Sequence, residues 1–205
     1  MILVWQLLVE FKVVSSLLLS PPTTVFPRFW SIMNYVRGDA NVPFGFEQTL
    51  AIIALAVIIV VVTGTFLGFL IGSVKFVRNV LEEYIVAIYA LPKITLIPFF
   101  WLLFGVSLNY RLGFGVLNGV FPLIIVTMYA AGGVDPALMK MARSIGASRS
   151  ERLFKVFLPS MIPSLMSGIR IGFVTTFSAV VTAEMFVGST GIGFSSFEYN
   201  PHKSE

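Results

Sequence analysis

The sequence predicts an all-α membrane protein, a polytopic helical bundle that crosses the bilayer several times. Of its 205 residues, 57% are hydrophobic and 12% are charged, whereas soluble domains average about 45–50% and 25%. The mean hydropathy is +0.91, and uncharged runs of about 20 residues, enough for one helical crossing, recur along the chain. So much apolar surface has to face lipid, which excludes a soluble globule and a disordered chain.

Residues 1–47 are predicted to form a separate N-terminal segment. Residues 1–9 are apolar, but Glu10 and Lys12 interrupt the run before it reaches crossing length. A cleavable signal peptide fits poorly, because the basic start that such peptides carry is missing. We expect a partial or interfacial helix here, followed by a periplasmic segment.

Four longer runs reach crossing length: residues 48–74, 84–110, 112–134 and 159–187. Lys93 interrupts the second run and Pro92 and Pro98 bend it, which a helix buried among others tolerates. We therefore predict four spans, or five if the N-terminal helix is counted.

The basic residues indicate how the spans are oriented. The connections 75–83 and 135–158 hold seven of the 14 Lys and Arg residues. Cytoplasmic loops carry such an excess, so both are placed inside. The region before residue 48, the link near Arg111 and the tail after residue 187 are then expected outside.

Three glycines in the first span predict a helix-packing seam. Gly64, Gly68 and Gly72 recur every four residues and so share one helix face. Without side chains there, another helix can approach closely, which is how spans associate in lipid.

The last span carries a polar stripe that predicts a path across the membrane. Thr175, Ser178 and Thr182 share one helix face. Two interpretations stay open, because such hydroxyls either bond to carbonyls of their own helix or line a wet path. Glu184 either faces protein or a water-filled path, as costly intramembrane charges do, or lies at the outer interface and caps the glycine-rich turn after it.

The cytoplasmic connection 135–158 is predicted to form two short helices. Asp135 and Pro136 suit the N-cap and first position of one helix, and Gly146 suits its end. Ser148 and Glu151 have capping-box spacing for the second. A segment this ordered and basic is either a docking surface or a positively charged anchor without a partner.

The same connection resembles the EAA loop of bacterial ABC importer permeases, a motif of two alanine-type positions, a glycine and a terminal Ile-x-Leu-Pro. Here KMA starts at Lys140, Gly146 follows after three residues, and VFLP ends at Pro159 after nine more. The segments ARSIGAS, LPSMIPSLMSGIRIG, AEM and GIG are similar to the nitrate, sulfonate and taurine branch of that family.

This resemblance implies a MetI-like permease fold in the bacterial inner membrane. Two permease subunits, expected to be two copies of one chain, would form the path for a small anionic solute. A soluble binding protein would deliver the solute, and two cytoplasmic ATPases would bind ATP and Mg²⁺. The helix after Asp135 would be the coupling helix. The residues then assigned to ATPase coupling are Asp135, Lys140, Met141, Ala142, Arg143, Gly146, Ala147, Ser148, Leu158 and Pro159.

No chemistry is expected in the chain itself. It has no Gly-Lys-Ser/Thr phosphate loop, so it should need no cofactor and hydrolyse no ATP. The absence of Cys excludes a thiolate metal site and an iron–sulfur cluster, and we expect no metal. The formal net charge of +4 mostly reports sidedness, so we expect membrane lipid and no nucleic acid as partners.

The chain departs from the family pattern in three ways. Lys140 stands where the family has Glu, and Met141 stands where Ala is usual. We also expect a permease shortened at both ends, with a permease domain over 48–194 and a polar tail over 195–205. The alternative function is a transport-inactive or structural membrane subunit of the same family.

Overall fold

The computed structural model describes residues 5, 6, 9, 11, 21–33, 36–37 and 40–187. Most of the helix expected over residues 1–9 lies outside these, as do the glycine-rich turn after Glu184 and the tail 195–205. The first described elements are α2 (Pro22–Met33) and the antiparallel pair β1 (Val36–Arg37) and β2 (Ala40–Asn41).

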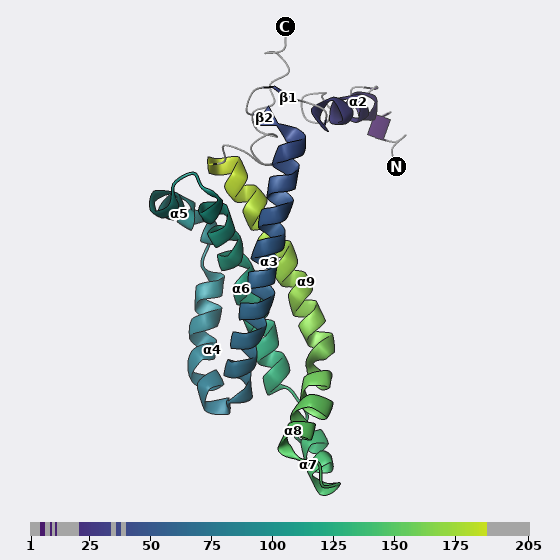
Figure 1. The fold of residues 1–205 in the computed structure, drawn as a ribbon, viewed down its shortest axis with the longest axis vertical. Coiled ribbons are helices and arrows are strands. Elements are labelled where there is room, and N and C mark those ends of the chain that lie inside the picture. The colour runs from purple at the N-terminus through teal and green to yellow at the C-terminus, as the bar shows by residue number, and fades with distance from the viewer. Residues whose placement is uncertain are drawn as a thin grey trace.

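The rest of the described chain is helical, which confirms the predicted all-α class (Figure 1). The elements in order are α3 (Val42–Ser73), α4 (Lys75–Ala90), a 3₁₀-helix (Lys93–Leu96), α5 (Ile97–Phe104), α6 (Leu108–Gly132), α7 (Pro136–Ser144), α8 (Arg149–Glu151), a π-helical turn (Arg152–Phe157) and α9 (Leu158–Val187).

Three of these helices are long and apolar enough to cross a membrane: Gly45–Ser73, Leu108–Gly132 and Arg149–Phe186. A fourth crossing results if the bent pair Lys75–Ala90 and Lys93–Phe104 counts as one span. With the bent pair counted as one span, the described residues give four spans, the lower end of the predicted range.

The crossing predicted over residues 84–110, with bends at its prolines, falls in a sharply bent pair of helices. The chain bends by 76° between α4 and the segment that starts at Lys93. Leu91 is extended, with φ −64° and ψ 138°, because a residue before proline avoids the helical region. Pro92 supplies no N–H, so helix restarts only after it, and α5 ends at Gly105 with φ +62°.

Arg111 lies inside α6, which corrects the prediction of an outer link at this position. Ser107 caps α6 by accepting a hydrogen bond from the N–H of Tyr110 at 3.4 Å. The helix therefore starts at Leu108, ahead of the uncharged run that the sequence shows from residue 112.

Helices α3, α6 and α9 form the core of the bundle and lie side by side along its long axis (Figure 1). The glycine face of α3 contacts α6. A Cβ on Gly64 would lie 2.9 Å from the side chain of Leu123, and one on Gly68 would lie 2.7 Å from the carbonyl oxygen of Ile124. A Cβ on Gly72 would collide with the carbonyl oxygen of Met128. These glycines thus permit close backbone approach.

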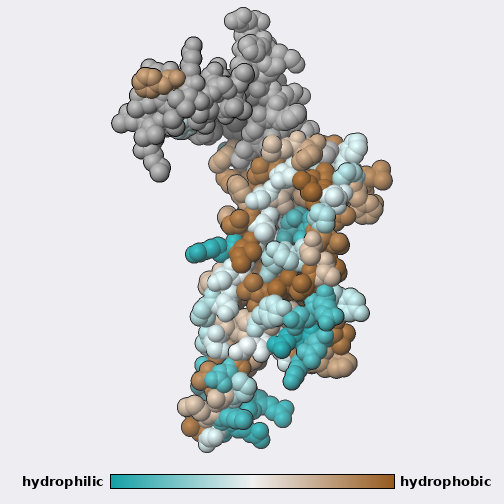
Figure 2. Space-filling model, turned by 180° about the vertical axis from the view of Figure 1, so that it is seen from behind, coloured by the Kyte–Doolittle hydropathy of each residue, from teal (hydrophilic) through white to brown (hydrophobic). Residues whose placement is uncertain are grey.

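The two basic connections lie at the same end of the bundle, as the predicted orientation requires. Figure 1 places α7, α8 and the start of α4 toward the lower end, and α5 toward the other. In Figure 2 hydrophilic surface gathers in this lower part, while hydrophobic surface covers much of the middle. An apolar surface that gives way to a hydrophilic end is typical of a bilayer-spanning protein.

Candidate functional site

A buried carboxylate joins the three core helices. The side chain of Glu184 on α9 is fully buried. The hydroxyl of Thr49 on α3 donates to it and lies 2.8 Å from Oε1 and 3.0 Å from Oε2. Arg111 on α6 donates from Nη1 to Oε1 at 3.3 Å. We call these three residues the carboxylate clamp.

The clamp is held by charge as well as by hydrogen bonds. An isolated charge inside a protein or bilayer is expensive, and pairing with a hydrogen-bonded opposite charge offsets this cost. Neighbouring Tyr110 adds a hydrogen bond from its hydroxyl to the carbonyl oxygen of Ala183 at 3.4 Å. The outer parts of α3, α6 and α9 are therefore tied together around Glu184.

A pocket of about 280 Å³ lies beside α6 and α9 and opens to the surface. Its lining residues come from the 3₁₀-helix, α6 and α9: Ile94, Phe114, Asn118, Val174, Thr175, Ser178, Ala179 and Thr182. We call it the polar pocket. It brings together three of the four residues predicted for the path, while Glu184 lies inside the bundle instead.

Two hydroxyls of the polar stripe bond to carbonyls of their own helix and also face a pocket. The hydroxyl of Thr175 donates to the carbonyl oxygen of Ile171 at 2.9 Å, and the hydroxyl of Thr182 donates to the carbonyl oxygen of Ser178 at 2.7 Å. The side chains line the pocket all the same. A hydroxyl can rotate to donate to a solute, at the net cost of one hydrogen bond, about 0.5–1.5 kcal/mol.

Asn118 of α6 lines the same pocket as the stripe, although it was not among the residues predicted for the path. Its Nδ2 donates to the carbonyl oxygen of Phe114 at 2.8 Å. Asn118 is a lone amide in a long apolar run, and this feature of the sequence could have indicated that α6 also contributes a polar group to the pocket.

An apolar cluster borders the polar pocket and includes the chain neighbours of two clamp residues. Phe114 and Ala179 line the pocket and also pack with Ile97, Tyr110 and Ala183. Phe100 of α5 meets Phe114 edge to face, with ring centroids 5.9 Å apart. The bent segment therefore reaches the pocket through Ile94 of the 3₁₀-helix, which lines it, and through α5, which packs on the lining residue Phe114.

The cytoplasmic connection has the helix caps that the sequence predicts. Asp135 accepts a hydrogen bond from the N–H of Ala137 at 2.7 Å and caps α7. Gly146 ends α7 with φ +82°, and the N–H of Ala147 bonds to the carbonyl oxygen of Ala142 at 3.0 Å, which is the Schellman pattern. Ser148 forms a capping box with Glu151 at the start of α8.

Helix α7 presents an exposed apolar face. Leu138, Met141 and Ile145 lie three and four residues apart, hence on one side of the helix, and are 42%, 67% and 85% exposed. Lys140 and Arg143 on the same helix are also exposed, whereas Ala142 is buried. Leu158 and Pro159 start α9 after the π-helical turn, so the two-helix element is continuous with the last span.

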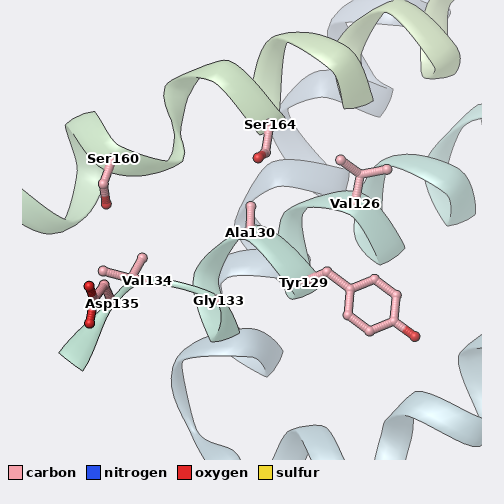
Figure 3. A pocket seen from close by; sticks show the side chains of 8 residues that line it. All are labelled: Val126, Tyr129, Ala130, Gly133, Val134, Asp135, Ser160 and Ser164. Carbon is pink, nitrogen blue, oxygen red and sulfur yellow. The ribbon is translucent and has the colours of Figure 1, made fainter. Parts of the chain in front are cut away.

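A second pocket, of about 490 Å³, lies between the end of α6 and the start of α9. We call it the cytoplasmic pocket (Figure 3). It is lined by Val126, Tyr129, Ala130, Gly133, Val134, Asp135, Ser160 and Ser164. Ser160 and Ser164 face the end of α6 across it.

No group of three or more His, Cys, Asp or Glu residues that could hold a metal ion occurs in the described part of the chain.

Comparison with known proteins identifies relatives along nearly the whole chain. A family model described as a binding-protein-dependent transport system inner membrane component matches residues 61–199. The chain is 28% identical over 193 residues to the taurine transport system permease protein TauC of Escherichia coli (strain K12), covering 93% of this chain and 70% of that protein.

Two further relatives are similar over comparable lengths. The nitrate import permease protein NrtB of Synechocystis sp. is 26% identical over 198 residues, covering 95% of this chain and 71% of that protein. The putative aliphatic sulfonates transport permease protein SsuC of Bacillus subtilis (strain 168) is 27% identical over 194 residues, with coverage of 94% and 68%.

Proposed function

Because the chain belongs to the family of binding-protein-dependent transport system inner membrane components, we propose that its polar pocket lies on the path of a small anionic solute. The chain is a multi-pass permease of an ABC importer and works with ATPase and substrate-binding partners. Relatives are named for taurine, nitrate and aliphatic sulfonates, solutes that share an oxyanion group. We extend that class to this chain.

The lining of the polar pocket is the observation that carries the proposal. Its polar groups are the hydroxyls of Thr175, Ser178 and Thr182 and the amide of Asn118, and none of its eight lining residues is charged. Hydroxyls and amides can donate to an oxyanion without the strong attraction of a fixed positive charge. A path needs such weak contacts, because the solute has to leave as readily as it enters.

The carboxylate clamp has a supporting role in this proposal. Glu184 is neutralised by Arg111 and shielded by Thr49, so it does not repel an anion in the nearby pocket as an unpaired carboxylate would. In this proposal Glu184 does not touch the solute and supports the path from inside the bundle, where its charge is paired.

The exposed apolar face of α7 supports docking of an ATPase. Apolar side chains exposed at the polar end of a membrane protein mark a protein contact, and Met141 and Ile145 are such residues. The caps at Asp135 and Gly146 stiffen α7, so that it can move as a rigid body. We propose that α7, together with the other residues assigned to ATPase coupling, forms the surface that binds the ATPase.

The remaining partners follow from the same proposal. A second copy of the chain completes the path, and a soluble binding protein delivers the solute from outside. ATP and Mg²⁺ are bound by the ATPase, and this chain holds no cofactor and catalyses no reaction of its own.

Uptake into proteoliposomes tests the proposal. The permease is reconstituted with its ATPase and binding protein, and uptake of radiolabelled taurine, sulfonate and nitrate is measured. We expect Ser178→Ala with Thr182→Val to lower uptake about tenfold, because two groups that can donate to the solute are lost. Ser167→Ala is the matched control, since Ser167 bonds to Pro163 of its own helix and does not line the pocket. Equal uptake by both variants would contradict the proposal.

A further inference from the structure

Helix α4 is held to the bundle with little burial, although it leads to the polar pocket. None of its residues is buried, whereas eleven residues of α6 are. After the 76° bend, the same stretch of chain places Ile94 in the pocket wall and Phe100 against Phe114. The position of the outer wall of the pocket therefore depends on how α4 is fixed.

A polar cluster fixes the first turns of α4 to the last turn of α6. The hydroxyl of Tyr129 on α6 donates to Oε1 of Glu82 at 2.7 Å. The other carboxylate oxygen of Glu82 lies 3.8 Å from Nε of Arg78. We call Arg78, Glu82 and Tyr129 the α4–α6 link. Hydrogen bonds to charged groups are stronger than those between neutral groups.

Gly132 completes the fit. A Cβ at this position would collide with Nη1 of Arg78 and lie 3.3 Å from its Cδ. The guanidinium group therefore occupies the place of a side chain at the end of α6. The absence of a side chain at residue 132 is what lets the link form in this geometry.

The link is close along the chain to α7, the proposed coupling helix. Residues 133 and 134 are the only ones between α6 and Asp135, which caps α7. On its other side the end of α6 borders the cytoplasmic pocket, and Figure 3 shows the ring of Tyr129 directed away from Ser160 and Ser164. The end of α6 thus borders open space on the side of α9 and is hydrogen-bonded to α4 on its other side.

We propose that the α4–α6 link carries movement of α7 to the bent segment over the polar pocket. When α7 moves, the end of α6 shifts within the open space and takes α4 with it through Glu82. The segment from Lys93 to α5 then moves relative to Phe114 and opens or closes the pocket. Arg78, Glu82 and Tyr129 are positioning residues for transport, and this inference rests on the proposed function.

The ratio of solute imported to ATP hydrolysed tests the inference in proteoliposomes with the complete importer. We expect Tyr129→Phe and Glu82→Leu each to lower this ratio about threefold, since each removes the hydrogen bond between the two side chains, while hydrolysis stimulated by the loaded binding protein persists. The double variant should lower it no further, because both changes remove the same bond. Tyr84→Phe is the matched control, an exposed tyrosine of α4.

A distance measurement separates loss of coupling from loss of folding. The chain has no Cys, so Val86→Cys on α4 and Ile162→Cys on α9 can carry two spin labels. We expect the distance between them to change when ATP is trapped in the complex, and the change to be reduced by Tyr129→Phe. An unaltered change together with an unaltered coupling ratio would overturn the inference. If instead the unmodified complex imports none of the tested solutes, the proposed function itself fails.

Discussion

Arg111 on α6 and Glu184 on α9 form an ion pair inside the bundle, with 3.3 Å between Nη1 and Oε1. The two residues are 73 positions apart and belong to the helices that enter and leave the cytoplasmic connection. The pair therefore joins these helices on the outside, while the cytoplasmic pocket separates them on the inside. This arrangement favours movement of their cytoplasmic ends about a fixed outer end.

Removing one partner of this pair should destabilise the protein strongly. Arg111→Leu removes a positive partner of the buried carboxylate of Glu184, and breaking a buried pair in this way costs about 3–5 kcal/mol of unfolding free energy. The double variant with Glu184→Leu should be more stable than Arg111→Leu alone, because the buried carboxylate is removed as well. Unfolding in detergent, followed by tryptophan fluorescence, measures both. Additive losses in the double variant would show that the pair is not coupled.

The exposed pair Glu151–Lys155, at 2.9 Å, is the natural control for that series. Both side chains are largely in solvent, so Lys155→Leu should change the unfolding free energy by about 0–1 kcal/mol.

Close packing of α3 on α6 predicts a cost for any side chain at Gly68. A Cβ there would lie 2.7 Å from the backbone oxygen of Ile124, which cannot move without shifting α6. We expect Gly68→Ala to lower the unfolding free energy by about 1–3 kcal/mol. Gly113→Ala is the comparison, since its Cβ would meet only the ring of Phe100 at 3.2 Å. Equal stability of the two variants would mean that the α3–α6 contact is looser than described.

The left-handed conformation of Gly146 predicts a second sensitive position. At φ +82°, a residue with a Cβ is strained by about 1–2 kcal/mol. Gly146→Ala should therefore loosen the end of α7 and weaken binding of the ATPase subunit, measured by co-purification at increasing salt and detergent. Gly146→Asn should be milder, because Asn tolerates this conformation better. Wild-type binding by Gly146→Ala would speak against a rigid α7.

The apolar face of α7 makes a separate prediction about the same partner. Ile145 is 85% exposed, so Ile145→Ser should leave the stability of the isolated permease unchanged while weakening its affinity for the ATPase about tenfold or more, as loss of an interface anchor does. Ser150→Ala, an exposed position on α8, should change neither quantity. Undiminished affinity of Ile145→Ser would place the docking surface elsewhere.

Local features of the structure were predictable from sequence, and distant contacts were not. Caps at Asp135, Gly146 and Ser148 depend on a few neighbouring residues, so their sequence signals were sufficient. The pairing of Arg111 with Glu184 depends on how two helices align, which a single sequence does not reveal. For this reason Arg111 was expected in an outer link.

The break at Pro92 shows a different limit. Spans tolerate proline when neighbours satisfy the freed carbonyls, so the sequence predicted a crossing bent at its prolines but did not give the size of the bend. In the structure α4 buries no side chain, and such a helix has few contacts to hold a proline-containing turn straight. The chain therefore bends by 76°.

The most direct test of the account is whether the polar pocket is accessible to solute in a way that depends on the ATPase. In this Cys-free chain, Ser178→Cys places one thiol in the pocket, and a membrane-impermeant, negatively charged thiol reagent is applied to proteoliposomes. We predict that the rate of modification changes at least severalfold when ATP is trapped, that solute slows modification, and that modified protein no longer imports. As a control, Ser167→Cys should react at one rate in all states and keep its uptake. The same behaviour of Ser178→Cys would contradict the account.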